Sequence, residues 1–519
     1  MAASAAVALA FCAWLASWYV AIPIEVEEWS ALLGADTFAH GKLANGAHPL
    51  SKHFERSHIL LEPTYVSELP PLPGMALAVG QWLGEPLIGS ALVFALAAAT
   101  LHWMLIGWGF STWWALSGAI CVAVHPQIAA FWGIGYLSGG TGLLGGALVY
   151  GALPRMRSAG GSASRAGFAL GMGAVVLLLS GPYLALVACL PVCFVLARDL
   201  VRSGSQPAAG HLRAQLRSAG VITAVGLAFL AYYNYRTTGD PLKTPHQAYV
   251  ERYATAPDFL LQAPLARPVY TNPSMPMLYR ENGRMNAPYY DRQHLTGFVA
   301  GIGKKIAVYG GFLFPLPLLL LLAPLPFLRR DPKVRFAVAA FVFFGAALSV
   351  QTFEVARFVA PFVALGSIPL LMGLREITRL SVRGIQFGAA LPPLILIPAW
   401  GIQYAQVTDL SIVRSVEPLV GHEMMLNSVA RFQRQDHLVL VRYGNGHAAR
   451  WEWLINEADI DGAHVVFALE LDEESNRKLL DYFPDREPWR LRSTNGEISI
   501  VPFGKAKEWR TAATSTDDS

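Results

Sequence analysis

Long apolar segments constrain this chain more than any other feature of its sequence. A helix that crosses a bilayer core of about 30 Å needs ~20 mainly apolar residues. Because the 519 residues are 54% hydrophobic and only 15% charged, the chain is too apolar for a soluble domain. We therefore predict an α-helical polytopic membrane protein with about eleven transmembrane helices, near residues 2–24, 85–108, 111–132, 136–153, 166–181, 182–198, 218–236, 309–328, 335–352, 357–374 and 385–405.

Basic residues indicate how these helices are oriented, because Lys and Arg are enriched in cytoplasmic loops. With a cytoplasmic N-terminus, one side of the membrane collects Arg155, Arg157, Arg165, Arg198, Arg202, Arg213, Arg217, Arg329, Arg330, Lys333, Arg335, Arg375, Arg379 and Arg383. Three segments are then left outside: 25–84, 237–305 and everything after residue 406. The short spans that meet at Gly181–Pro182 form either two helices or one broken helix. The first apolar run lacks a basic region before it and a small-residue cleavage site, which predicts a retained helix rather than a signal peptide.

Several functional classes are disfavoured by composition. The formal net charge is only +4 and the basic residues lie in short loops, so we expect no nucleic-acid binding. All four cysteines, Cys12, Cys121, Cys189 and Cys193, fall inside apolar runs. They are expected to behave as small hydrophobic residues, without a disulfide framework or a zinc site.

The last part of the chain has a different pattern. HLVLVRY (437–443) and HVVFALEL (464–471) are typical of strands, whereas ESNRKLLDYF has helical spacing. We predict a membrane domain over 1–406, a small extracytoplasmic α/β domain with a largely parallel sheet over 407–508, and a disordered tail over 509–519. The α/β domain is expected to form a wall of the acceptor channel. Its acids and histidines show no recurring metal-ligand spacing: Asp459, Asp461, His437, His447 and His464.

An unusual group of acids follows the first apolar run, where Glu25, Glu27 and Glu28 stand at the expected membrane surface. Carboxylates near hydrocarbon are costly and are usually kept there for a task. The simplest alternative is that they are acids at a helix end facing water. The residues EEWSALLGADTFAHGKL (27–43) have the pattern of an interfacial helix. Asp36 lies about 12 Å along that helix from Glu28, which favours a structural or substrate-positioning role.

The outer segments contain many aromatic residues and prolines. We expect 237–305 to fold as a lid over the first segment, which contains EPTYVSELPPLPG (62–74). Tyrosines here either stack on sugar rings or belong to an interfacial belt: Tyr65, Tyr136, Tyr249, Tyr253, Tyr289 and Tyr290.

A glycine-rich stretch, GYLSGGTGLLGGALVYG (135–151), is unsuited to bind a nucleotide phosphate, because no strand precedes it and the required Lys is missing. Small residues at this spacing indicate close helix packing or approach of a lipid tail. The pair His125–Pro126 is expected to kink its helix.

These motifs, in this order, resemble the GT-C superfamily of membrane glycosyltransferases. The similarity is greatest to the branch that contains protein O-mannosyltransferases and the lipid A aminoarabinose transferase. It extends to about residue 406 and rests on EEWSALLGADTFAHGKL, PTYVSELPPLPG, GYLSGGTGLLGGALVYGALPR and FEVARFVAP. The resemblance implies inverting transfer of a sugar from a polyprenyl-phosphate donor to a lipid, glycan or protein acceptor hydroxyl, at the periplasmic face of a bacterial inner membrane.

The resemblance also implies residue roles. An Asp or an Asp–Glu pair after the first span is the catalytic base of this family, and here the pair is Glu27–Glu28. Arg357 in FEVARFVAP is the leading candidate to bind the donor phosphate, slightly ahead of the alternatives that it is an interfacial anchor or a partner of Glu354. Weaker candidates for substrate binding are Asp36, Tyr65, His53, His58, Arg56, Lys304 and Lys305. Some members of the superfamily use a divalent metal, and no ligand set for one is evident here.

The alternative class is a non-catalytic membrane protein: a lipid or polysaccharide transporter, or a scaffold that binds cell-envelope polymer. A transporter is expected to place charges inside its spans and to show broken helices in matching halves. This chain keeps its charges at the ends of the spans and shows no such halves, which favours the enzyme.

Overall fold

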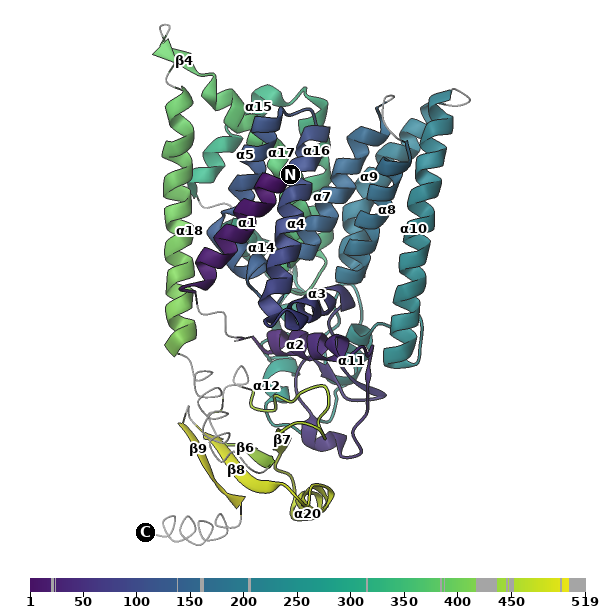
Figure 1. Ribbon diagram of the computed structural model, residues 1–519, viewed down its shortest axis with the longest axis vertical. Helices are drawn as coiled ribbons and strands as arrows, with labels where there is room; N and C mark the ends of the chain where they lie inside the picture. Colours follow the sequence, from purple (N-terminus) through teal and green to yellow (C-terminus); the bar gives the residue numbers. More distant parts are fainter. Residues whose placement is uncertain are drawn as a thin grey trace.

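The computed structural model describes residues 1–19, 23, 25–137, 139–158, 163–203, 207–313, 316–382, 385–386, 388–416, 436–444, 447, 452–494 and 497–503. Long helices form a bundle in which they run roughly side by side (Figure 1). They are α1 (Ala2–Ala16), α4 (Pro86–Gly107), α5 (Thr112–Ala123), α7 (Gly139–Met156), α8 (Ala163–Ser180), α9 (Pro182–Ser203), α10 (Pro207–Thr238), α14 (Leu295–Leu313), α16 (Pro332–Ser349), α17 (Ala360–Thr378) and α18 (Leu391–Val416). Each of these helices overlaps a predicted apolar run, although several of their bounds differ from the predicted ones.

The structure identifies this chain as a multi-pass membrane protein, but it does not confirm a count of about eleven spans. Among the described residues, five helices are long and apolar enough to cross a membrane, and up to seven if each of two bent pairs is one span. Two further apolar helices are shorter. One is α1, whose 15 residues are fewer than the run 2–24 predicted, with residues 20–22 and 24 outside the described chain.

Prolines account for two of the helix breaks. The segments Thr112–Ala123 and Pro126–Gly133 meet at an angle of 63°, which confirms the kink predicted at His125–Pro126. The second segment is formed by α6 (Pro126–Ile128) and the π-helical turn η2 (Ala129–Gly133). α8 ends at Ser180 and α9 begins at Pro182, so the short pair is two helices, since proline is favoured in a first turn and ends the preceding helix.

The boundary of the second outer segment was predicted wrongly. α14 begins at Leu295, inside the predicted loop 237–305, and it is followed by η3 (Leu316–Leu322) and α15 (Leu325–Leu328) at an angle of 94°. The two lysines of α14, Lys304 and Lys305, were weak candidates for phosphate binding that could equally be solvated loop residues. One of them, Lys305, is buried and donates hydrogen bonds to the carbonyls of Leu348, at 2.6 Å, and Gln351, so its charge is compatible with a helix.

One end of the bundle, which we call the loop-rich end, carries both remaining outer segments. There α2 (Val26–Ala39) and α3 (Pro71–Trp82) lie across the ends of the long helices (Figure 1). The same end holds η1 (Ser51–Phe54), α11 (Pro245–Tyr253), α12 (Met275–Tyr279), α13 (Ala287–Asp291) and a sheet of β1 (Asn45–Gly46), β3 (Thr64–Ser67) and β2 (Ile59–Leu60). The opposite end, the basic end, includes β4 (Ser381–Val382), β5 (Ile385–Gln386), the last turns of α7 and α9 and the first turns of α8 and α10.

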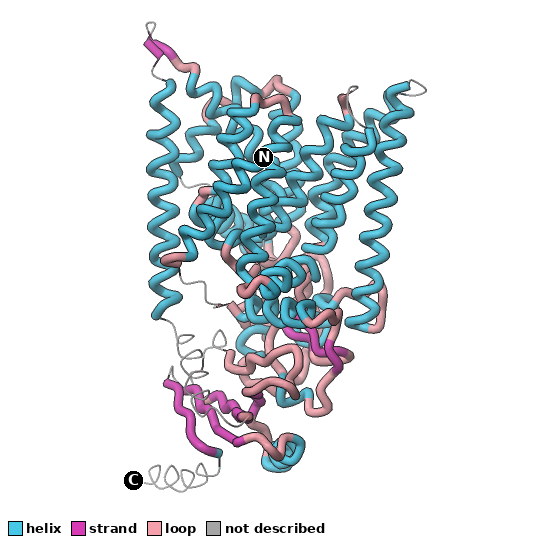
Figure 2. Tube along the Cα trace, in the orientation of Figure 1, coloured by secondary structure: helices cyan, strands magenta, loops and turns pink. Residues whose placement is uncertain are grey.

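The C-terminal region confirms the predicted α/β pattern. Its sheet has the order β7 (Val465–Leu469), β6 (His437–Tyr443), β8 (Glu487–Thr494) and β9 (Glu497–Pro502), with α20 (Glu473–Tyr482) between β7 and β8 (Figure 2). β6 pairs in parallel with both β7 and β8, and only β9 is antiparallel. The predicted tail, 509–519, lies outside the described residues.

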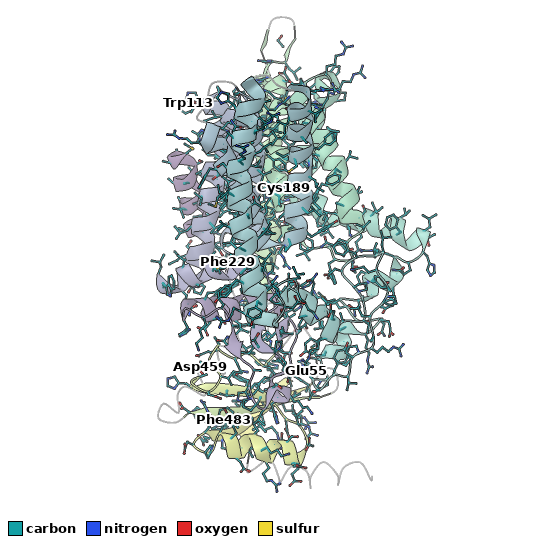
Figure 3. All side chains as sticks on the ribbon, turned by 90° about the vertical axis from the view of Figure 1, so that its right-hand side faces the viewer. Glu55, Trp113, Cys189, Phe229, Asp459 and Phe483 are labelled. Atoms are coloured by element: carbon teal, nitrogen blue, oxygen red, sulfur yellow. The ribbon has the colours of Figure 1, made fainter. Side chains whose placement is uncertain are left out.

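This C-terminal sheet packs against the first outer segment. A single apolar cluster combines Leu33, Phe54 and Tyr65 of that segment with Leu438 of β6 and Leu479 of α20. Figure 3 shows Glu55 of the first segment close to the C-terminal region, at the opposite end of the molecule from Trp113. The loop-rich end is therefore one packed unit of residues far apart in sequence.

Candidate active site

Glu27 and Glu28, which are neighbours in the first turn of α2, have different surroundings. Glu25 and Glu28 form a capping box, in which the backbone N–H of Glu25 donates to Glu28 Oε2 at 3.2 Å. This arrangement satisfies N–H groups that a helix start leaves without partners. Successive side chains on a helix point about 100° apart, so Glu27 faces elsewhere. It lines a cavity between α2 and the ends of the long helices.

Glu27 is paired with Arg357 of the short helix η4 (Ala356–Val359), which leads into α17. Glu27 Oε2 accepts a hydrogen bond from Arg357 Nη1 at 2.5 Å. The side chain of Glu27 is 16% exposed and that of Arg357 is 22% exposed. Burial opposes ionisation of Glu27, but the charge of Arg357, assisted by His58, outweighs it and lowers the pKa of Glu27 below its ordinary value. The pair is thus an ionised carboxylate beside a guanidinium whose other N–H donors are not used in the contact with Glu27.

The cavity around this pair has a volume of about 270 Å³. Its walls come from both outer segments and from the ends of α7, α9, α10 and η4. Residues that line it include Glu27, His58, Glu68, Thr141, Tyr183, Asn234, His246, Tyr249, Asp258, Phe259, Tyr279 and Arg357. A polar wall of acids, histidines and tyrosines therefore faces aromatic and apolar side chains, which is the usual composition of a small-molecule site.

A chain of hydrogen-bonded acids and histidines forms the polar wall beside Glu27. His58 Nδ1 donates to Glu68 Oε1 at 2.5 Å. Glu68 Oε2 accepts from His246 Nδ1 at 3.1 Å, and His246 Nε2 lies 3.0 Å from both carboxylate oxygens of Asp258. The hydroxyl of Tyr279 is 3.4 Å from His58 Nε2. This row of side chains joins the first outer segment to the second, so the two segments are in direct contact at the cavity.

The charge states of these hydrogen-bonded acids and histidines follow from their geometry. Both ring nitrogens of His246 face carboxylates, and although burial opposes its charge, Asp258 and Glu68 raise the pKa of His246 well above its ordinary value. Burial likewise opposes ionisation of Glu68, but His246 and His58 lower its pKa to about 2. His246 is therefore an imidazolium held between two carboxylates at neutral pH.

His58 is held in an unusual backbone conformation at the same wall. Its φ of 64° lies in the left-handed region, which residues other than glycine seldom adopt. Two hydrogen bonds fix its carbonyl, from Ser30 Oγ at 2.5 Å and from the N–H of Glu68 at 3.2 Å. Such conformations concentrate at functional sites, where surrounding contacts maintain them.

The two predicted lysine candidates lie away from the cavity. Lys304 Nζ is 3.4 Å from Glu354, which also contacts the buried Arg292. Lys305 is engaged with backbone carbonyls inside the bundle. Glu354, the alternative partner considered for Arg357, is thus occupied by other cations, and Arg357 is paired with Glu27 instead.

Other predicted candidates lie at the contact with the C-terminal region. Asp36 Oδ2 accepts from the N–H of Ala458 at 2.7 Å, His53 Nδ1 is 2.8 Å from the carbonyl of Leu469, and Arg56 Nη1 donates to that of Leu454 at 2.8 Å. Tyr65 is buried in the apolar cluster between the two regions. These residues hold the loop-rich end together and do not line the cavity.

Among the acids and histidines that line the cavity, three were not singled out from the sequence: Glu68, His246 and Asp258. Glu68 stands in the quoted motif PTYVSELPPLPG, where an acid before two prolines gave a usable signal. His246 is 178 residues away from Glu68, and no local pattern links them. Within the described residues, no group of three or more His, Cys, Asp or Glu side chains is arranged to hold a metal ion.

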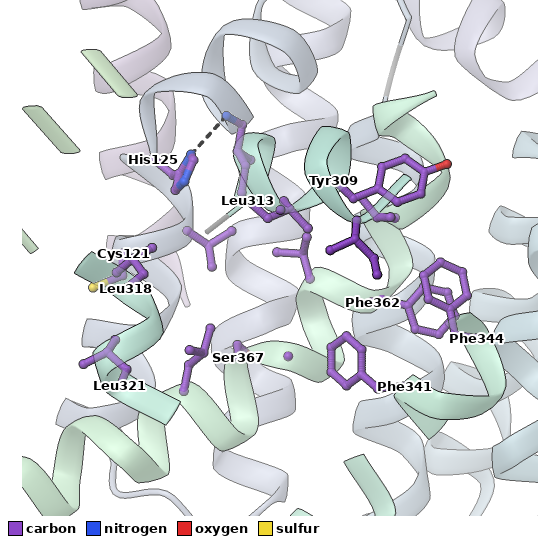
Figure 4. A pocket seen from close by; sticks show the side chains of 18 of the residues that line it. Cys121, His125, Tyr309, Leu313, Leu318, Leu321, Phe341, Phe344, Phe362 and Ser367 are labelled. Atoms are coloured by element: carbon purple, nitrogen blue, oxygen red, sulfur yellow. Dashed lines mark hydrogen bonds between the residues drawn. The ribbon is translucent and has the colours of Figure 1, made fainter. Parts of the chain in front are cut away.

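A second cavity, of about 470 Å³, lies inside the bundle among α5, α14, α16, α17 and α18. Phe341, Phe344, Phe362 and Leu318 face it, together with His125, which is bonded to the backbone of Leu313 (Figure 4). Its lining includes Leu348 and Val359, whereas Gln351 and Arg357 line the first cavity. The two cavities therefore adjoin the same segment between α16 and α17.

Comparison with known proteins gives matches only among solved structures. No protein-family model and no curated protein matches the sequence. The fold is similar to that of ArnT from Cupriavidus metallidurans bound to undecaprenyl phosphate, at 12% identity and a TM-score of 0.45, over 94% of this chain and 92% of that one.

Two further solved structures match at similarly low sequence identity. The Archaeoglobus fulgidus oligosaccharyltransferase AglB in complex with an inhibitory peptide and a dolichol-phosphate matches at 10% identity and a TM-score of 0.46, over 94% of this chain and 69% of that one. The arabinofuranosyltransferase AftD from Mycobacteria matches at 11% identity and a TM-score of 0.44, over 96% of this chain and 35% of that one. All are GT-C membrane glycosyltransferases, the superfamily that the sequence resembles. At these scores the likeness assigns no substrate and no residue role.

Proposed function

We propose that the protein is an inverting glycosyltransferase that moves a sugar from a polyprenyl-phosphate donor to an acceptor hydroxyl at the loop-rich end. The observation that carries the proposal is the Glu27–Arg357 pair at the wall of the 270 Å³ cavity. It brings a carboxylate and a guanidinium together, which supports the catalytic base and the phosphate-binding cation that the sequence resemblance to the GT-C superfamily implies. The loop-rich end would then face the periplasm of a bacterial inner membrane.

In this mechanism Glu27 is the base and Arg357 binds the donor phosphate. The phosphate draws the Arg357 guanidinium, which offers more N–H donors than its contact with Glu27 uses. Glu27 accepts the proton of the acceptor hydroxyl as that oxygen attacks the anomeric carbon from the face opposite the phosphate. The bond from the anomeric carbon to the phosphate oxygen breaks, and its electron pair leaves on the phosphate.

The prenyl tail is proposed to occupy the apolar cavity inside the bundle. A donor whose phosphate lies at Arg357 can place its tail among Val359, Phe362 and Phe344, because the two cavities adjoin the same segment. The sugar would then lie towards His58 and Tyr279. The C-terminal sheet closes the loop-rich end and would bound the path of the acceptor.

The test is transfer of radiolabel from a panel of polyprenyl-phosphate sugars in membranes that carry the wild type, Glu27→Gln or Glu28→Gln. We expect Glu27→Gln to reduce transfer by about 10²-fold or more, as removal of a general base does. Glu28→Gln is the matched control one residue away, and its amide can still accept the capping hydrogen bond from Glu25. We expect it to retain transfer.

Two outcomes would contradict the proposal. Transfer that survives Glu27→Gln removes Glu27 as the base. If no donor in the panel supports transfer while the protein is folded, a non-catalytic transporter or an envelope-polymer scaffold becomes the better assignment.

A further inference from the structure

A third cavity lies at the basic end, on the opposite side of the bundle from the candidate active site. It has a volume of about 1090 Å³ and opens between α9 and the first half of α16, beside the ends of α4 and α7. α9 and α16 stand in the upper half of the bundle in Figure 1, whereas α2 lies below it. Neither the proposed chemistry nor the comparisons give this cavity a role.

The walls of this cavity are apolar on the side of the bundle. They include Leu190, Phe194 and Val195 of α9 and Phe336, Ala340 and Phe343 of α16. Phe194 is 71% exposed and Phe343 is 40% exposed, so the apolar wall continues onto the outer surface of the helices. On a membrane-spanning bundle this surface contacts lipid, and the cavity is therefore open to a lipid chain.

Cations surround the mouth of the same cavity: Arg157, Arg198, Lys333 and Arg335. Arg157 and Arg198 share Asp199, at 2.8 and 3.4 Å. Asp331 caps α16 by accepting from the N–H of Lys333 at 2.8 Å. Four cations thus face two carboxylates, which leaves an excess of positive charge.

Two of these cations are available to a ligand. In the part of the chain that the structure describes, no ion pair involves Lys333 or Arg335. Lys333 Nζ rests 5.8 Å from the ring centroid of Phe110, and Arg335 is exposed. An ammonium and a guanidinium at the end of an apolar groove match the phosphate and the chains of one amphiphile.

We propose that this cavity binds an anionic phospholipid from the leaflet at the basic end. Lys333 and Arg335 contact its phosphate, and an acyl chain lies along Phe194, Phe336 and Phe343. A soluble phosphate compound fits less well, because it would leave the apolar wall uncovered. The inference is independent of the proposed transfer reaction, since it uses none of the residues of the candidate active site.

The test is native mass spectrometry of the full-length protein with phosphatidylglycerol and with phosphatidylcholine of identical acyl chains. For the wild type we expect several-fold tighter binding of phosphatidylglycerol. The variant Lys333→Gln/Arg335→Gln should lose most of this preference, with about fivefold weaker binding for each cation removed. Its matched control is Arg202→Gln/Arg217→Gln, which removes the same charge from two exposed positions outside the cavity that, among the described residues, also form no ion pair.

A second variant tests the apolar wall without changing charge. Ala339→Trp places a large side chain at the lining of the cavity, and it should weaken phosphatidylglycerol binding while the protein elutes and melts like the wild type. Equal losses in both double variants would assign the preference to general surface charge and overturn the proposal. Displacement of the lipid by glycerol phosphate at equal concentration would overturn it as well, by showing a site for a soluble anion.

Discussion

At the scale of single residues, the state of Glu27 depends on Arg357. Burial opposes the charge of Glu27, and the guanidinium more than offsets that opposition, so the pKa of Glu27 is lowered. Removing Arg357 therefore raises that pKa, and the base becomes protonated at a higher pH. For Arg357→Gln we expect the acidic limb of the pH–rate profile to move to higher pH, with at least about 10²-fold loss of kcat/KM from the lost phosphate contact.

Arg357→Lys separates the two effects. It retains the charge that lowers the pKa of Glu27 but loses the planar group that binds phosphate with two parallel hydrogen bonds. We expect its acidic limb to remain close to that of the wild type while KM for the donor increases. If Arg357→Gln loses activity without any movement of the acidic limb, Arg357 does not control the ionisation of Glu27.

His246 gives the loop-rich end a dependence on pH. Its raised pKa means that its contribution to stability is complete below the unfolded value of about 6.5 and is lost as pH rises through the higher folded value. Glu68, whose folded pKa is about 2, contributes above its usual value and loses that contribution as the pH falls towards 2. We expect the melting temperature of the wild type to fall at alkaline pH more steeply than that of His246→Gln.

The control for this measurement is His211→Gln, at an exposed position of α10. Its melting temperature should follow that of the wild type at every pH. The groups that face His246 are Glu68, Asp258 and, through Glu68, His58. Parallel curves for the wild type and His246→Gln across the alkaline range would show that His246 is not an imidazolium in the folded protein.

At the scale of elements, the glycine-rich stretch bears out its interpretation as a packing surface. Gly142 and Gly146 of α7 face the start of α17, where a Cβ on Gly146 would lie 2.5 Å from the carbonyl oxygen of Pro361. Pro361 is four residues beyond Arg357. We expect Gly146→Ala to push α17 away from α7, to cost about 1–3 kcal/mol as overpacking does, and to reduce transfer by displacing Arg357.

Gly220→Ala is the matched control for this prediction. A Cβ at Gly220 of α10 meets no atom within 4 Å, and alanine is the better helix former by about 1 kcal/mol. Its thermal stability and transfer should equal or exceed those of the wild type. Equal melting temperatures for Gly146→Ala and Gly220→Ala would mean that α7 and α17 can separate without cost.

The sequence predicted helices well where apolar runs are long, and less well where a polar residue is satisfied inside the structure. α4 and α16 lie close to their predicted runs, whereas α14 starts earlier because Lys305 binds backbone carbonyls and tolerates burial. The two-residue strands β1 and β2 are too short to give any periodicity. Their antiparallel pairing with β3 depends on how the whole segment 45–67 folds back on itself.

The same distinction holds for the candidate site. Glu27, His58 and Arg357 were identifiable because each stands beside a membrane boundary or in a motif of the outer segments, and all three line the cavity. Glu68, His246 and Asp258 form their chain only after two outer segments fold together. Asp36 and His53 were chosen by residue type, and contacts with the C-terminal sheet account for them instead. Sequence alone contains no information on such pairings.

At the scale of the whole molecule, the C-terminal region is fixed to the same helix that carries Glu27. Asp36 of α2 accepts the N–H of Ala458 at 2.7 Å through one carboxylate oxygen and Gln81 Nε2 of α3 at 3.3 Å through the other. A hydrogen bond to a charged group contributes about 1.5–3 kcal/mol. Asp36→Ala should therefore loosen the attachment of residues 452–461 by about tenfold or more, without unfolding the sheet.

Hydrogen exchange followed by mass spectrometry measures this loosening directly. In Asp36→Ala we expect faster exchange in 452–461 and unchanged exchange in α20, whose own contacts remain. Glu474→Ala is the control, because Glu474 is an exposed acid of α20 paired only with Lys478 among the ion pairs of the described residues. If exchange in 452–461 is the same in both variants, the apolar cluster around Phe54 and Leu438 holds the region alone. If exchange is faster and transfer also falls, the C-terminal region sets the position of α2 and thereby of Glu27.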